Sequence, residues 1–479
     1  MYDVAIVGCG VIGAAAAYYL SMYDLKILVL EKENDIAMGA TRANSAIIHA
    51  GYDPEPGTLM ARLNVRGCEM AKDLCYKLSV PYRQCGSLVL AFSAAEDETV
   101  KMLYDRGVQN GVKGMMILTA EEVHEMEPQV SDQVTSALYA PSAGIVNPWE
   151  YALAFAEVAV LNGVELYRNS EVTDIRKTEK GFEINAGKNT FESRFVINSA
   201  GVDSAFVHEM VADRSFTVKP SKGSYYLMDK CECARANHVL FQCPSEKGKG
   251  VLVSPTVHGN LIVGPDAEPS KDMHRVNTTA ASLSYVKSAA AKSVPGIDYR
   301  NAIRNFAGMR ANTDQSDFVI GFAAPGFLDL AGIKSPGLTS APAIGEEAVK
   351  LLKEAGLELV PKVSPVQTRK KLRFKELSED EKCAAIAKNP LYGRVICRCE
   401  TITEGEIVDA IRSPIPPVSV DGIKRRAGTG MGRCQGGFCG PRVLEILARE
   451  LEIDPKQVLK DQAGSYILAD ETKTGGMRV

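Results

Sequence analysis

Apolar residues at the start of the chain form a short run that predicts a buried strand. Residues 2–7 are largely apolar and β-branched, a pattern typical of a parallel strand that is covered on both faces. The run leads into three closely spaced glycines and then into an alanine-rich segment of helical character. A second apolar run follows at residues 26–30. The pattern therefore predicts a strand, a glycine turn, a helix and a second strand.

Alternating apolar and polar positions predict a different sheet in the middle of the chain. The runs at residues 86–92 and 250–255 alternate as half-buried strands do. We expect the segments around them to form a mixed or antiparallel sheet that is inserted into the first domain. Two helices are expected later, at residues 339–352 and from 441 to about 451, the second with an apolar stripe.

The glycines of the first turn have the spacing that a dinucleotide requires. Gly8 permits a tight turn, Gly10 lets a pyrophosphate approach the backbone, and Gly13 lets the helix pack closely on the strand. Glu31 ends the second strand, where a carboxylate can accept both hydroxyls of an adenosine ribose. Glycines also make plain turns, but the whole arrangement predicts a Rossmann-like dinucleotide site.

Composition narrows the class of protein. With 479 residues, 46% hydrophobic and 24% charged, the chain can bury a large core in two or three domains. Its net charge of -4 gives no positive electrostatic field that would attract nucleic acid. No apolar run reaches the roughly 18–20 residues of a membrane helix, so we expect at most peripheral membrane docking through partners. The immediate first strand leaves no room for a leader, which predicts a cytoplasmic protein whose 12 cysteines stay reduced.

Several stretches resemble the FAD-binding segments of the D-amino-acid oxidase superfamily. Residues 39–51, GATRANSAIIHAG, resemble the loop that lines the pyrophosphate and the flavin. Residues 171–175 resemble the strand that meets the adenine, residues 198–201 a second FAD-contacting turn, and residues 332–339 the turn and helix start that point at the flavin ring. The resemblance implies FAD as cofactor. The residues it places at FAD are Gly8, Gly10, Ile12, Gly13, Glu31, Lys32, Thr41, Asn44, Ser45, Val172, Ala200, Gly201, Gly332, Gly337, Leu338 and Thr339.

The predicted fold class is α/β: a Rossmann-like FAD-binding domain, an inserted mixed or antiparallel substrate domain, and a small helical C-terminal domain. A polar, proline-bracketed linker with one short helix separates the last domain from the rest. The expected boundaries are 1–80, 146–214 and 326–358 for the FAD-binding domain, 81–145 and 215–325 for the substrate domain, 359–392 for the linker, 393–460 for the C-terminal domain and 461–479 for a tail.

His49 is the candidate catalytic base. Oxidation of a C–H bond next to a hydroxyl requires a base for the hydroxyl proton, and histidine titrates near neutral pH. The IIHAG stretch resembles dehydrogenases for glycerol 3-phosphate and L-2-hydroxyglutarate, in which the matching histidine lies beside the flavin. A role in packing the flavin is the alternative. We expect the other five histidines to be solvated or held by local hydrogen bonds.

Arg310 is the candidate partner for the anionic group of the substrate. In FAGMR it occupies the position of the arginine that holds a carboxylate or phosphate in related enzymes, and a guanidinium suits either group. Lys334 lies inside the turn that is expected to face the flavin, and is a further candidate at the reacting centre. Lys222 and Tyr225 are weaker candidates for supporting the arginine.

Four cysteines near the C-terminal end suggest a metal site. Cys397 and Cys399 are separated from Cys434 and Cys439 by 34 residues. Four thiolates suit either a zinc ion or an iron–sulfur cluster. The pattern resembles the [2Fe–2S] module of bacterioferritin-associated ferredoxin, which implies that these four cysteines bind a [2Fe–2S] cluster. Cys231, Cys233 and Cys243, in contrast, are expected to be reduced surface thiols without a metal.

The surroundings of the four cysteines suggest how a negative cluster is stabilised. Cys439 directly precedes a predicted helix, whose N-terminus is expected to lower the pKa of the thiol. Five basic residues are interleaved among the ligands and are expected to offset the charge of the cluster. They are Arg398, Lys424, Arg425, Arg426 and Arg433.

The resemblances together imply an FAD-dependent dehydrogenase that acts on a CH–OH group. Its expected substrate is a small anionic hydroxy compound, glycerol 3-phosphate first and L-2-hydroxyglutarate second. Electrons are expected to pass through the [2Fe–2S] cluster to an acceptor protein or a quinone-linked subunit. The alternatives are an amino- or imino-acid dehydrogenase of the same superfamily and a non-catalytic electron-transfer subunit.

Overall fold

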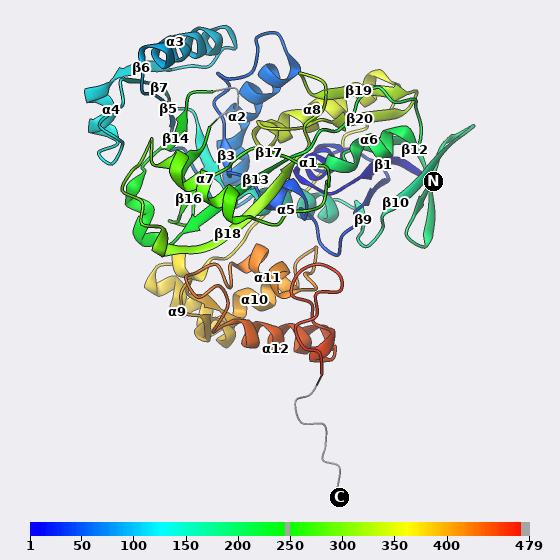
Figure 1. Cartoon of the computed structure of the whole chain (residues 1–479). Helices are drawn as coiled ribbons and strands as arrows, with labels where there is room; N and C mark the ends of the chain where they lie inside the picture. Colours follow the sequence, from blue (N-terminus) through cyan, green and yellow to red (C-terminus); the bar gives the residue numbers. More distant parts are fainter. Residues whose placement is uncertain (245–249, 471–479) are drawn as a thin grey trace, which may run out of the picture. The chain divides into compact units, whose positions relative to one another are not determined.

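The chain divides into two compact units, and one of them is discontinuous. The computed structural model describes residues 1–244 and 250–470, so the predicted tail lies outside the described residues from 471 onward. Figure 1 shows the helices and strands coloured along the chain. The first unit comprises residues 1–32 and 36–369, and the second comprises residues 33–35 and 370–479.

The first unit contains a sheet in which eight strands are described. Its strand order is β10-β11-β12-β1-β2-β9, with β20 added beside β12 and β19 beside β20. The strands from β12 to β9 are parallel, as the continuous apolar runs predict, and β10 and β11 form an antiparallel extension. The strands are β1 (Tyr2–Val7), β2 (Ile27–Leu30), β9 (Glu165–Tyr167), β10 (Val172–Thr178), β11 (Gly181–Ala186), β12 (Asn189–Asn198), β19 (Val319–Ala324) and β20 (Phe327–Ala331).

Small side chains let helices approach the first helix closely. In α1 (Val11–Leu20) the alanines at 14–17 are at most 1% exposed, and the helix packs against α5 (Pro148–Leu161) and α8 (Gly337–Glu354). A Cβ on Gly345 of α8 would lie 2.9 Å from the carbonyl oxygen of Ala15. Backbone contact of this kind requires glycine and alanine at the crossing, which explains the low side-chain volume in this stretch.

A second, mixed sheet forms the other half of the first unit. Nine described strands have the order β17-β13-β16-β15-β14-β5-β7-β6, with β18 also paired to β13. All pairs are antiparallel except β14 with β5. The strands are β5 (Ser87–Ala91), β6 (Met116–Thr119), β7 (Ser136–Ala140), β13 (Ser221–Met228), β14 (Val239–Gln242), β15 (Leu252–Pro255), β16 (Leu261–Gly264), β17 (Glu268–Pro269) and β18 (Ala302–Arg310).

Smaller elements complete the first unit. A three-stranded sheet joins β3 (Ile47–Ile48), β8 (Gly144–Val146) and β4 (Tyr82–Arg83). The remaining helices are α2 (Leu59–Lys77), α3 (Ala94–Gln109), α4 (Ala120–Met126), α6 (Ser204–Glu209) and α7 (Ala280–Ala290). Short 3-10 turns lie at Ala40–Arg42, Gly201–Asp203, Lys230–Arg235 and Tyr299–Asn301.

The predicted fold class is confirmed, and the elements read from apolar patterns agree closely with the structure. The strand predicted at residues 2–7 is β1, and the helix predicted at 339–352 lies inside α8. Strand β19 falls within the segment expected for the substrate domain, but it pairs with β20 and belongs to the eight-stranded sheet. Because β19 is short and lies where the chain passes from one sheet to the other, its sequence pattern does not show which sheet it joins.

The second unit is a small helical domain with its own apolar core. Val443 and Leu447 of the predicted stripe are fully buried together with Ile407 and Ile423. The linker helix predicted between the units is present and belongs to this unit. Its elements are α9 (Glu379–Lys388), β21 (Val395–Cys397), β22 (Ile402–Thr403), α10 (Glu404–Ile411), α11 (Val420–Ala427) and α12 (Gly440–Leu451), with 3-10 turns at Phe374–Glu376, Pro390–Gly393 and Pro455–Gln457.

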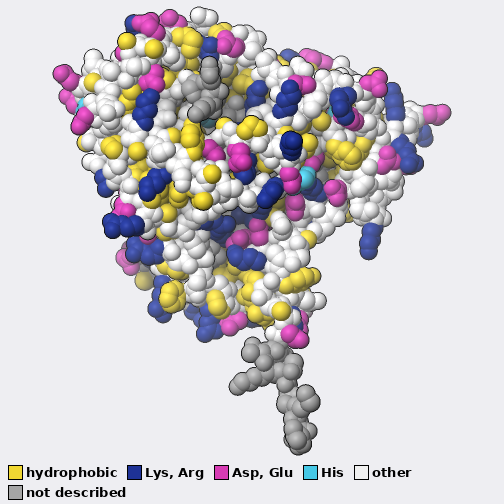
Figure 2. Space-filling model, viewed as in Figure 1, with side chains coloured by type: hydrophobic (Ala, Val, Ile, Leu, Met, Phe, Trp, Pro, Cys, Tyr) yellow, Lys and Arg dark blue, Asp and Glu magenta, His cyan; other side chains and the backbone are white. Residues whose placement is uncertain are grey.

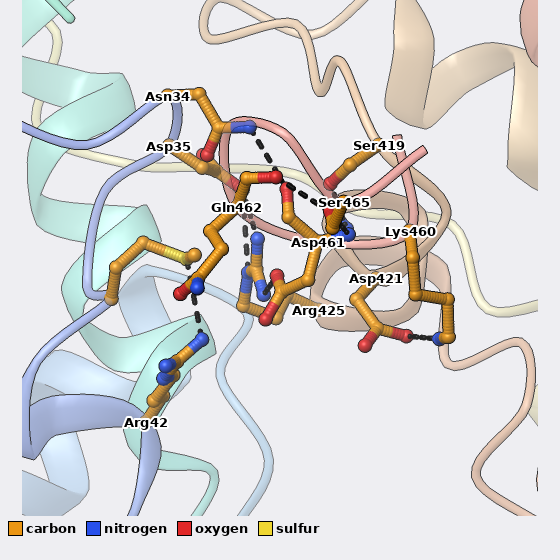
Figure 3. Close-up of polar contacts among 12 residues, drawn as sticks. Asn34, Asp35, Arg42, Ser419, Asp421, Arg425, Lys460, Asp461, Gln462 and Ser465 are labelled. Atoms are coloured by element: carbon orange, nitrogen blue, oxygen red, sulfur yellow. Dashed lines mark hydrogen bonds and ion pairs between the residues drawn. The ribbon is translucent and has the colours of Figure 1, made fainter. Parts of the chain in front are cut away.

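A buried ion cluster holds the N-terminal segment of the second unit. Asp35 is 1% exposed and accepts hydrogen bonds from two arginines of α11. The Nη2 atoms of Arg425 and Arg426 lie 2.9 and 2.8 Å from its carboxylate oxygens. Arg425 also pairs with Asp461 at 2.7 Å, and the side-chain amide of Asn34 donates to the Asp461 carbonyl (Figure 3). Two cations and two carboxylates thus balance in the interior.

The pKa of Asp35 reflects this environment. Burial by itself raises the pKa of the carboxyl, but Arg426 and then Arg425 lower it by more, so the pKa lies well below its ordinary value. A carboxylate whose folded-state pKa is depressed stabilises the fold above its unfolded pKa of about 3.9, and this contribution is lost as pH falls below that value.

The surface carries both charge signs. On the face drawn in Figure 2, Lys and Arg side chains are interspersed with Asp and Glu. This agrees with the small net charge of -4. Among the described residues, none of the helices has the length and apolarity needed to cross a bilayer.

We expect Asp35→Asn to destabilise the second unit by about 3–5 kcal/mol, because it leaves two buried guanidiniums with one remaining carboxylate. Hydrogen exchange at the amides of α11 measures the effect. Asp461→Asn is the matched control: its carboxylate pairs with the same Arg425 but is partly exposed, so its loss costs less. The difference between wild type and Asp35→Asn is expected to shrink below about pH 4. Equal exchange in the two variants at pH 7 would contradict the assignment.

Candidate functional site

The loop at residues 39–51 is fastened at both ends by hydroxyl groups. The Thr41 Oγ1 accepts the backbone N–H of Val11, the first residue of α1, at 3.0 Å. The Thr339 Oγ1, near the start of α8, accepts the backbone N–H of His49 at 2.9 Å. The side-chain amide of Asn64 donates to the His49 carbonyl at 2.7 Å. The starts of α1 and α8, together with α2, therefore fix the position of the loop at residues 39–51.

The glycine turn after β1 has the shape required for a pyrophosphate. Gly8 has φ +91°, and a Cβ there would lie 2.7 Å from the Ser199 carbonyl oxygen. A Cβ on Gly13 would lie 2.0 Å from the Gly8 carbonyl oxygen. The Glu31 carboxylate accepts the backbone N–H of Cys9 at 2.8 Å, which brings the acid to the turn. Glycine is therefore required at Gly8 and Gly13 because the turn packs closely on the segment after β12 and on its own backbone, as in the turn of dinucleotide-binding folds.

Asn44 supports an unusual backbone conformation in the middle of the loop. Ala46 has φ +61°, a left-handed conformation that alanine adopts rarely. The Asn44 Oδ1 accepts the Ala46 N–H at 2.8 Å, and Asn44 also donates to the Thr41 carbonyl at 2.9 Å. The strain is therefore held by the loop itself and places Ser45 at its outer bend.

The other predicted FAD residues lie at the ends of β-strands in the eight-stranded sheet. Val172 begins β10 and is buried, whereas Ala200 and Gly201 follow β12, with Gly201 at φ +61°. Lys32 follows β2 and pairs with Asp203 at 2.8 Å. Strands β2, β1 and β12 are neighbours in the sheet, so their carboxyl ends meet at one edge, where nucleotides bind in open α/β sheets, whereas β10 is separated from β12 by β11.

The turn at residues 332–339 meets the ring of His49. Gly332 has φ +61°, and Gly337 begins α8, where a Cβ would lie 2.6 Å from Ile333 Cγ2. The Ser335 Oγ lies 3.4 Å from His49 Nε2, and the His49 ring stacks on Phe241 with centroids 5.6 Å apart. Leu338 is half-buried, and Thr339 is buried. The predicted base therefore lies beside the predicted flavin turn.

Strands β13 and β18 face the same loop from the substrate sheet. The Tyr225 hydroxyl lies 3.2 Å from Ser45 Oγ, and its ring stacks on Phe306 with centroids 4.8 Å apart. A Cβ on Gly308 would lie 1.8 Å from the Ala43 carbonyl oxygen. Tyr225 and Phe306 are opposite each other in the pairing, and alternate residues share a face.

Arg310 lies on this same face, two positions beyond Gly308. It is opposite Ser221 in the register, and its guanidinium donates to the Asp266 carbonyl at 3.0 Å and toward Ser221 Oγ at 3.4 Å. A Cβ on Gly223 would lie 2.6 Å from its Nη2. The guanidinium therefore lies across Gly223 on the face that meets the 39–51 loop, and its role in holding an anion stays a prediction.

The two predicted lysines have different surroundings. Lys334 is half-buried, and its ammonium donates to the Gln315 carbonyl at 3.2 Å. Lys222 is buried and pairs with Glu268 at 3.1 Å, and this lysine is the first cause of a lowered pKa of Glu268. The charge of Lys222 is therefore already matched within the sheet.

Sequence reasoning missed the residues that support these groups. Phe241 and Asp266 lie in ordinary sequence surroundings, and only the fold brings them to His49 and Arg310, whereas Ser335 lies in the predicted flavin turn but was not singled out. Gly223 and Gly308 carried a usable signal, since glycine inside a strand pattern indicates close backbone approach.

The other histidines agree only in part with the expectation of solvation or local hydrogen bonds: His274 is exposed and His208 bonds to Asp213 five positions away, but long-range partners are also present. His208 Nδ1 lies 2.6 Å from Asp329, and His238 Nδ1 lies 2.8 Å from Glu127. His258 lies 3.0 Å from the Asn147 side chain. Each of these partners is more than 100 positions away in the chain, so these histidines stabilise tertiary contacts.

The four C-terminal cysteines form two close pairs in the second unit. Cys399 Sγ lies 3.7 Å from Cys434 Sγ, and Cys397 hydrogen-bonds with Cys439. A Cβ on Gly432 would lie 2.3 Å from the Cys399 Cβ, so glycine is needed where the two segments meet. In the described residues no three His, Cys, Asp or Glu side chains gather as ligands of a single metal ion. Cys231 is an exposed thiol and Cys233 is half-buried, whereas Cys243 is buried, so the expectation of a surface thiol is wrong for Cys243.

The thiol pKa values correct one expectation. The hydrogen bond from Cys439 lowers the pKa of Cys397 to about 6, and the same bond together with burial raises the pKa of Cys439. The predicted lowering at Cys439 by its helix is therefore wrong, because the pair holds one proton and Cys397 takes the negative charge. At Cys434 the backbone N–H of Phe438 lowers the pKa of the thiol.

The basic residues around the cysteines also differ from the expectation. Arg425 and Arg426 do not serve the cysteines, because their guanidiniums are buried on Asp35. Arg398 and Arg433 are exposed, and Lys424 is half-buried. Backbone N–H groups, including that of Phe438, take a larger share in stabilising the thiolates than the sequence suggested.

We expect Gly308→Ala to displace the 39–51 loop, since a carbon–oxygen contact of 1.8 Å must open by roughly 1.5–2 Å to reach van der Waals distance. The expected result is a loss of stability of about 1–3 kcal/mol and of most of the bound FAD. Visible absorbance of the purified protein measures the FAD. Gly321→Ala on β19 is the control, because its Cβ would meet no atom within 4 Å. Full FAD content in Gly308→Ala would show that the loop does not carry the flavin.

Comparisons with known proteins agree with this geometry. The family model described as FAD dependent oxidoreductase matches residues 3–351, and the one described as BFD-like [2Fe-2S] binding domain matches residues 395–449. A glycerol 3-phosphate dehydrogenase from Caloramator mitchellensis is 48% identical over 477 residues, which cover 99% of each chain. An L-2-hydroxyglutarate dehydrogenase from Nematostella vectensis is 32% identical over 56% of this chain and 62% of its own.

A solved structure shares the fold of the first unit. The dithionite-reduced L-α-glycerophosphate oxidase from Mycoplasma pneumoniae with FAD bound aligns with a TM-score of 0.73 at 33% identity, covering 78% of this chain and 99% of that one. The donor set fits both groups: an open glycine turn with a ribose acid for FAD, and two thiol pairs for two irons. The chain belongs to the FAD-dependent oxidoreductase family and is an enzyme with FAD and a [2Fe–2S] cluster as its cofactors.

Proposed function

We propose that the protein is a glycerol-3-phosphate dehydrogenase that passes its electrons through the [2Fe–2S] cluster to an external acceptor. The observation that carries this proposal is the 48% identity to a glycerol 3-phosphate dehydrogenase over 99% of both chains. The position of His49 between the flavin turn and Phe241 supports it, because oxidation of an alcohol requires a base at this place.

His49 is the proposed base. When bound, FAD supplies the acceptor for the hydride that leaves the substrate carbon. The substrate hydroxyl proton passes to the His49 ring, and the alcohol becomes a ketone. The backbone N–H of His49 donates to Thr339, and its ring stacks on Phe241. The ring is therefore presented to the substrate in one orientation.

Arg310 is the proposed partner of the substrate phosphate. Its guanidinium is preorganised by the Asp266 carbonyl and Ser221, and an arginine fork retains donors for a phosphate oxygen. Lys334, on the flavin turn, is proposed to add positive charge at the reacting end. Tyr225 closes the space between the substrate sheet and Ser45, which excludes water.

The four paired cysteines are the proposed ligands of the cluster. Cys397, Cys399, Cys434 and Cys439 would hold the cluster, and the two close sulfur pairs in this unit support that set of ligands. The cluster carries single electrons, which suits an acceptor that takes one electron at a time. The chain's 12 cysteines are free thiols, and a cytoplasmic location is part of the proposal.

The second unit favours an acceptor other than oxygen. The full-length relative is named a dehydrogenase, whereas the glycerol 3-phosphate oxidase from Mycoplasma pneumoniae aligns with 73% of this chain and 94% of its own. A C-terminal unit present with the dehydrogenase and outside the oxidase match is the expected place for electrons to leave. An acceptor protein or a quinone-linked subunit is proposed to receive them.

Anaerobic bleaching of the flavin tests the substrate and the base together. Glycerol 3-phosphate is expected to bleach the flavin, and L-2-hydroxyglutarate and amino acids are expected to leave it oxidised. His49→Ala is expected to slow bleaching by about 10²–10⁴-fold, the usual contribution of a general base. Stopped-flow absorbance measures both results. The control is His124→Ala, since this histidine lies on α4, a helix that contributes no residue to the predicted site.

The other outcomes separate the rival functions. Bleaching by L-2-hydroxyglutarate alone assigns the dicarboxylate as substrate. Bleaching by an amino acid that persists in His49→Ala assigns an amine dehydrogenase, whose neutral substrate needs no strong base. A flavin that stays oxidised with every compound indicates a subunit that only transfers electrons.

Removal of one thiolate tests the cluster ligands. We expect Cys434→Ser to lose most of the iron and the visible absorbance of the cluster while FAD stays bound, because these residues belong to separate units. Iron analysis and the absorbance spectrum measure the two cofactors. Cys383→Ser is the matched control: an exposed cysteine on α9 of the same unit, which is expected to keep its iron. Unchanged iron in Cys434→Ser would remove this residue from the ligand set.

A further inference from the structure

The chain passes between the two units more than once. It enters the second unit at Glu33, leaves it after Asp35, and enters again at residue 370. A single flexible connection would let the two units turn freely. The early passage adds a second connection, made of three residues that lie directly after the end of β2.

Both flanks of this segment are fixed in the first unit. The Glu31 N–H donates to the Tyr167 carbonyl at 2.9 Å, and the Glu31 carboxylate accepts from Cys9. On the other side, the Ala37 N–H donates to the Cys9 carbonyl at 3.0 Å. Since an extended chain gains at most about 3.5 Å per residue, the Asp35 Cα lies within about 14 Å of the Glu31 Cα and about 7 Å of the Ala37 Cα.

The segment is fixed just as firmly within the second unit. The Asp35 carboxylate accepts three short hydrogen bonds from Arg425 and Arg426. Figure 3 shows Asp35 with Arg425, and the Asn34 side chain that donates to the Asp461 carbonyl. Arg426 also donates to the carbonyl oxygens of Ile415 and Gly422, and Lys371 donates to the Arg426 carbonyl. Both arginines thus have their position set by several partners.

A buried ion cluster is a poor means of adding stability, since well-packed apolar side chains of the same volume often do as well or better. Its distinctive property is that it permits one arrangement, because any other leaves charges buried without partners. A cluster of this kind at a chain crossing therefore restricts position more than it adds stability.

We propose that Asp35 is a positioning residue for electron transfer: it fastens the segment behind the ribose acid Glu31 into the cluster-bearing unit and so limits the positions that this unit takes. The inference rests on the proposed relay. Transfer between two bound groups slows steeply as their separation grows. A second unit whose position varies therefore delivers electrons more slowly than one whose position is restricted.

The decisive variant lengthens the connection between the two units at residues 33–35 without changing any side chain. A Gly-Ser dipeptide is inserted after Glu33 and again after Asp35 in the holoenzyme. FAD content, iron content, α11 hydrogen exchange and flavin bleaching by glycerol 3-phosphate are expected to stay as in wild type. Cluster reduction after bleaching is expected to slow by at least about tenfold, and small-angle X-ray scattering is expected to show a broader distribution of interatomic distances. The same dipeptide inserted after Lys188, in the hairpin between β11 and β12, is the control.

Unchanged cluster reduction and unchanged scattering in the insertion variant would overturn the proposal. If the insertion lowers FAD or iron content, Asp35→Asn at pH 7 replaces it, and wild-type cluster reduction and scattering in that variant would overturn the proposal equally. Failure of the proposed function is distinguishable: if glycerol 3-phosphate does not bleach wild type, the flavin is reduced by light with EDTA, and the rate of cluster reduction is compared as before.

Discussion

The backbone N–H of His49, donated to the Thr339 hydroxyl, is the interaction on which the arrangement of the first unit depends. It ties the loop at residues 39–51 to the start of α8, while Thr41 ties the other end to the start of α1. Because two parts of the fold that bind the dinucleotide meet the same short loop, each helix start fixes the position of the other. The substrate sheet adds the close contact of Gly308 with Ala43. The cofactor side and the substrate side are thus built onto a single stretch of backbone.

Local signals in the sequence predicted much of this unit. The glycine turn and Glu31 were readable because their function is set by spacing along one strand, turn and helix. In the second unit, the spacing of the four cysteines was specific enough to predict the [2Fe–2S] binding domain, because their pattern is short and chemically distinctive. The partners of buried charges were not readable: Arg425 and Arg426 meet Asp35 about 390 positions away, and His208 meets Asp329 121 positions away. Periodicity tells which face of an element is buried and does not tell which distant residue it meets.

Helix and charge arguments at the cysteines failed for a related reason. They treated each thiol as an isolated group near a helix end or a cation. In the fold, Cys397 and Cys439 share one proton, so one pKa falls and the other rises. Two of the five arginines and lysines assigned to the cluster are occupied by Asp35. A nearby charge in the sequence is therefore a weak guide to the field at a site when a buried partner elsewhere competes for it.

The three residues Glu33–Asp35 also affect how such a domain can be gained or lost. A gene fragment that begins at residue 370 encodes the four cysteines but leaves Arg425 and Arg426 with Asp461 as their remaining carboxylate in the cluster. A fragment that ends at residue 369 keeps Asp35 and lacks both arginines. Fusion at a single junction would therefore not produce a complete domain. The C-terminal domain therefore draws its buried charges from residues encoded at two distant places in the gene.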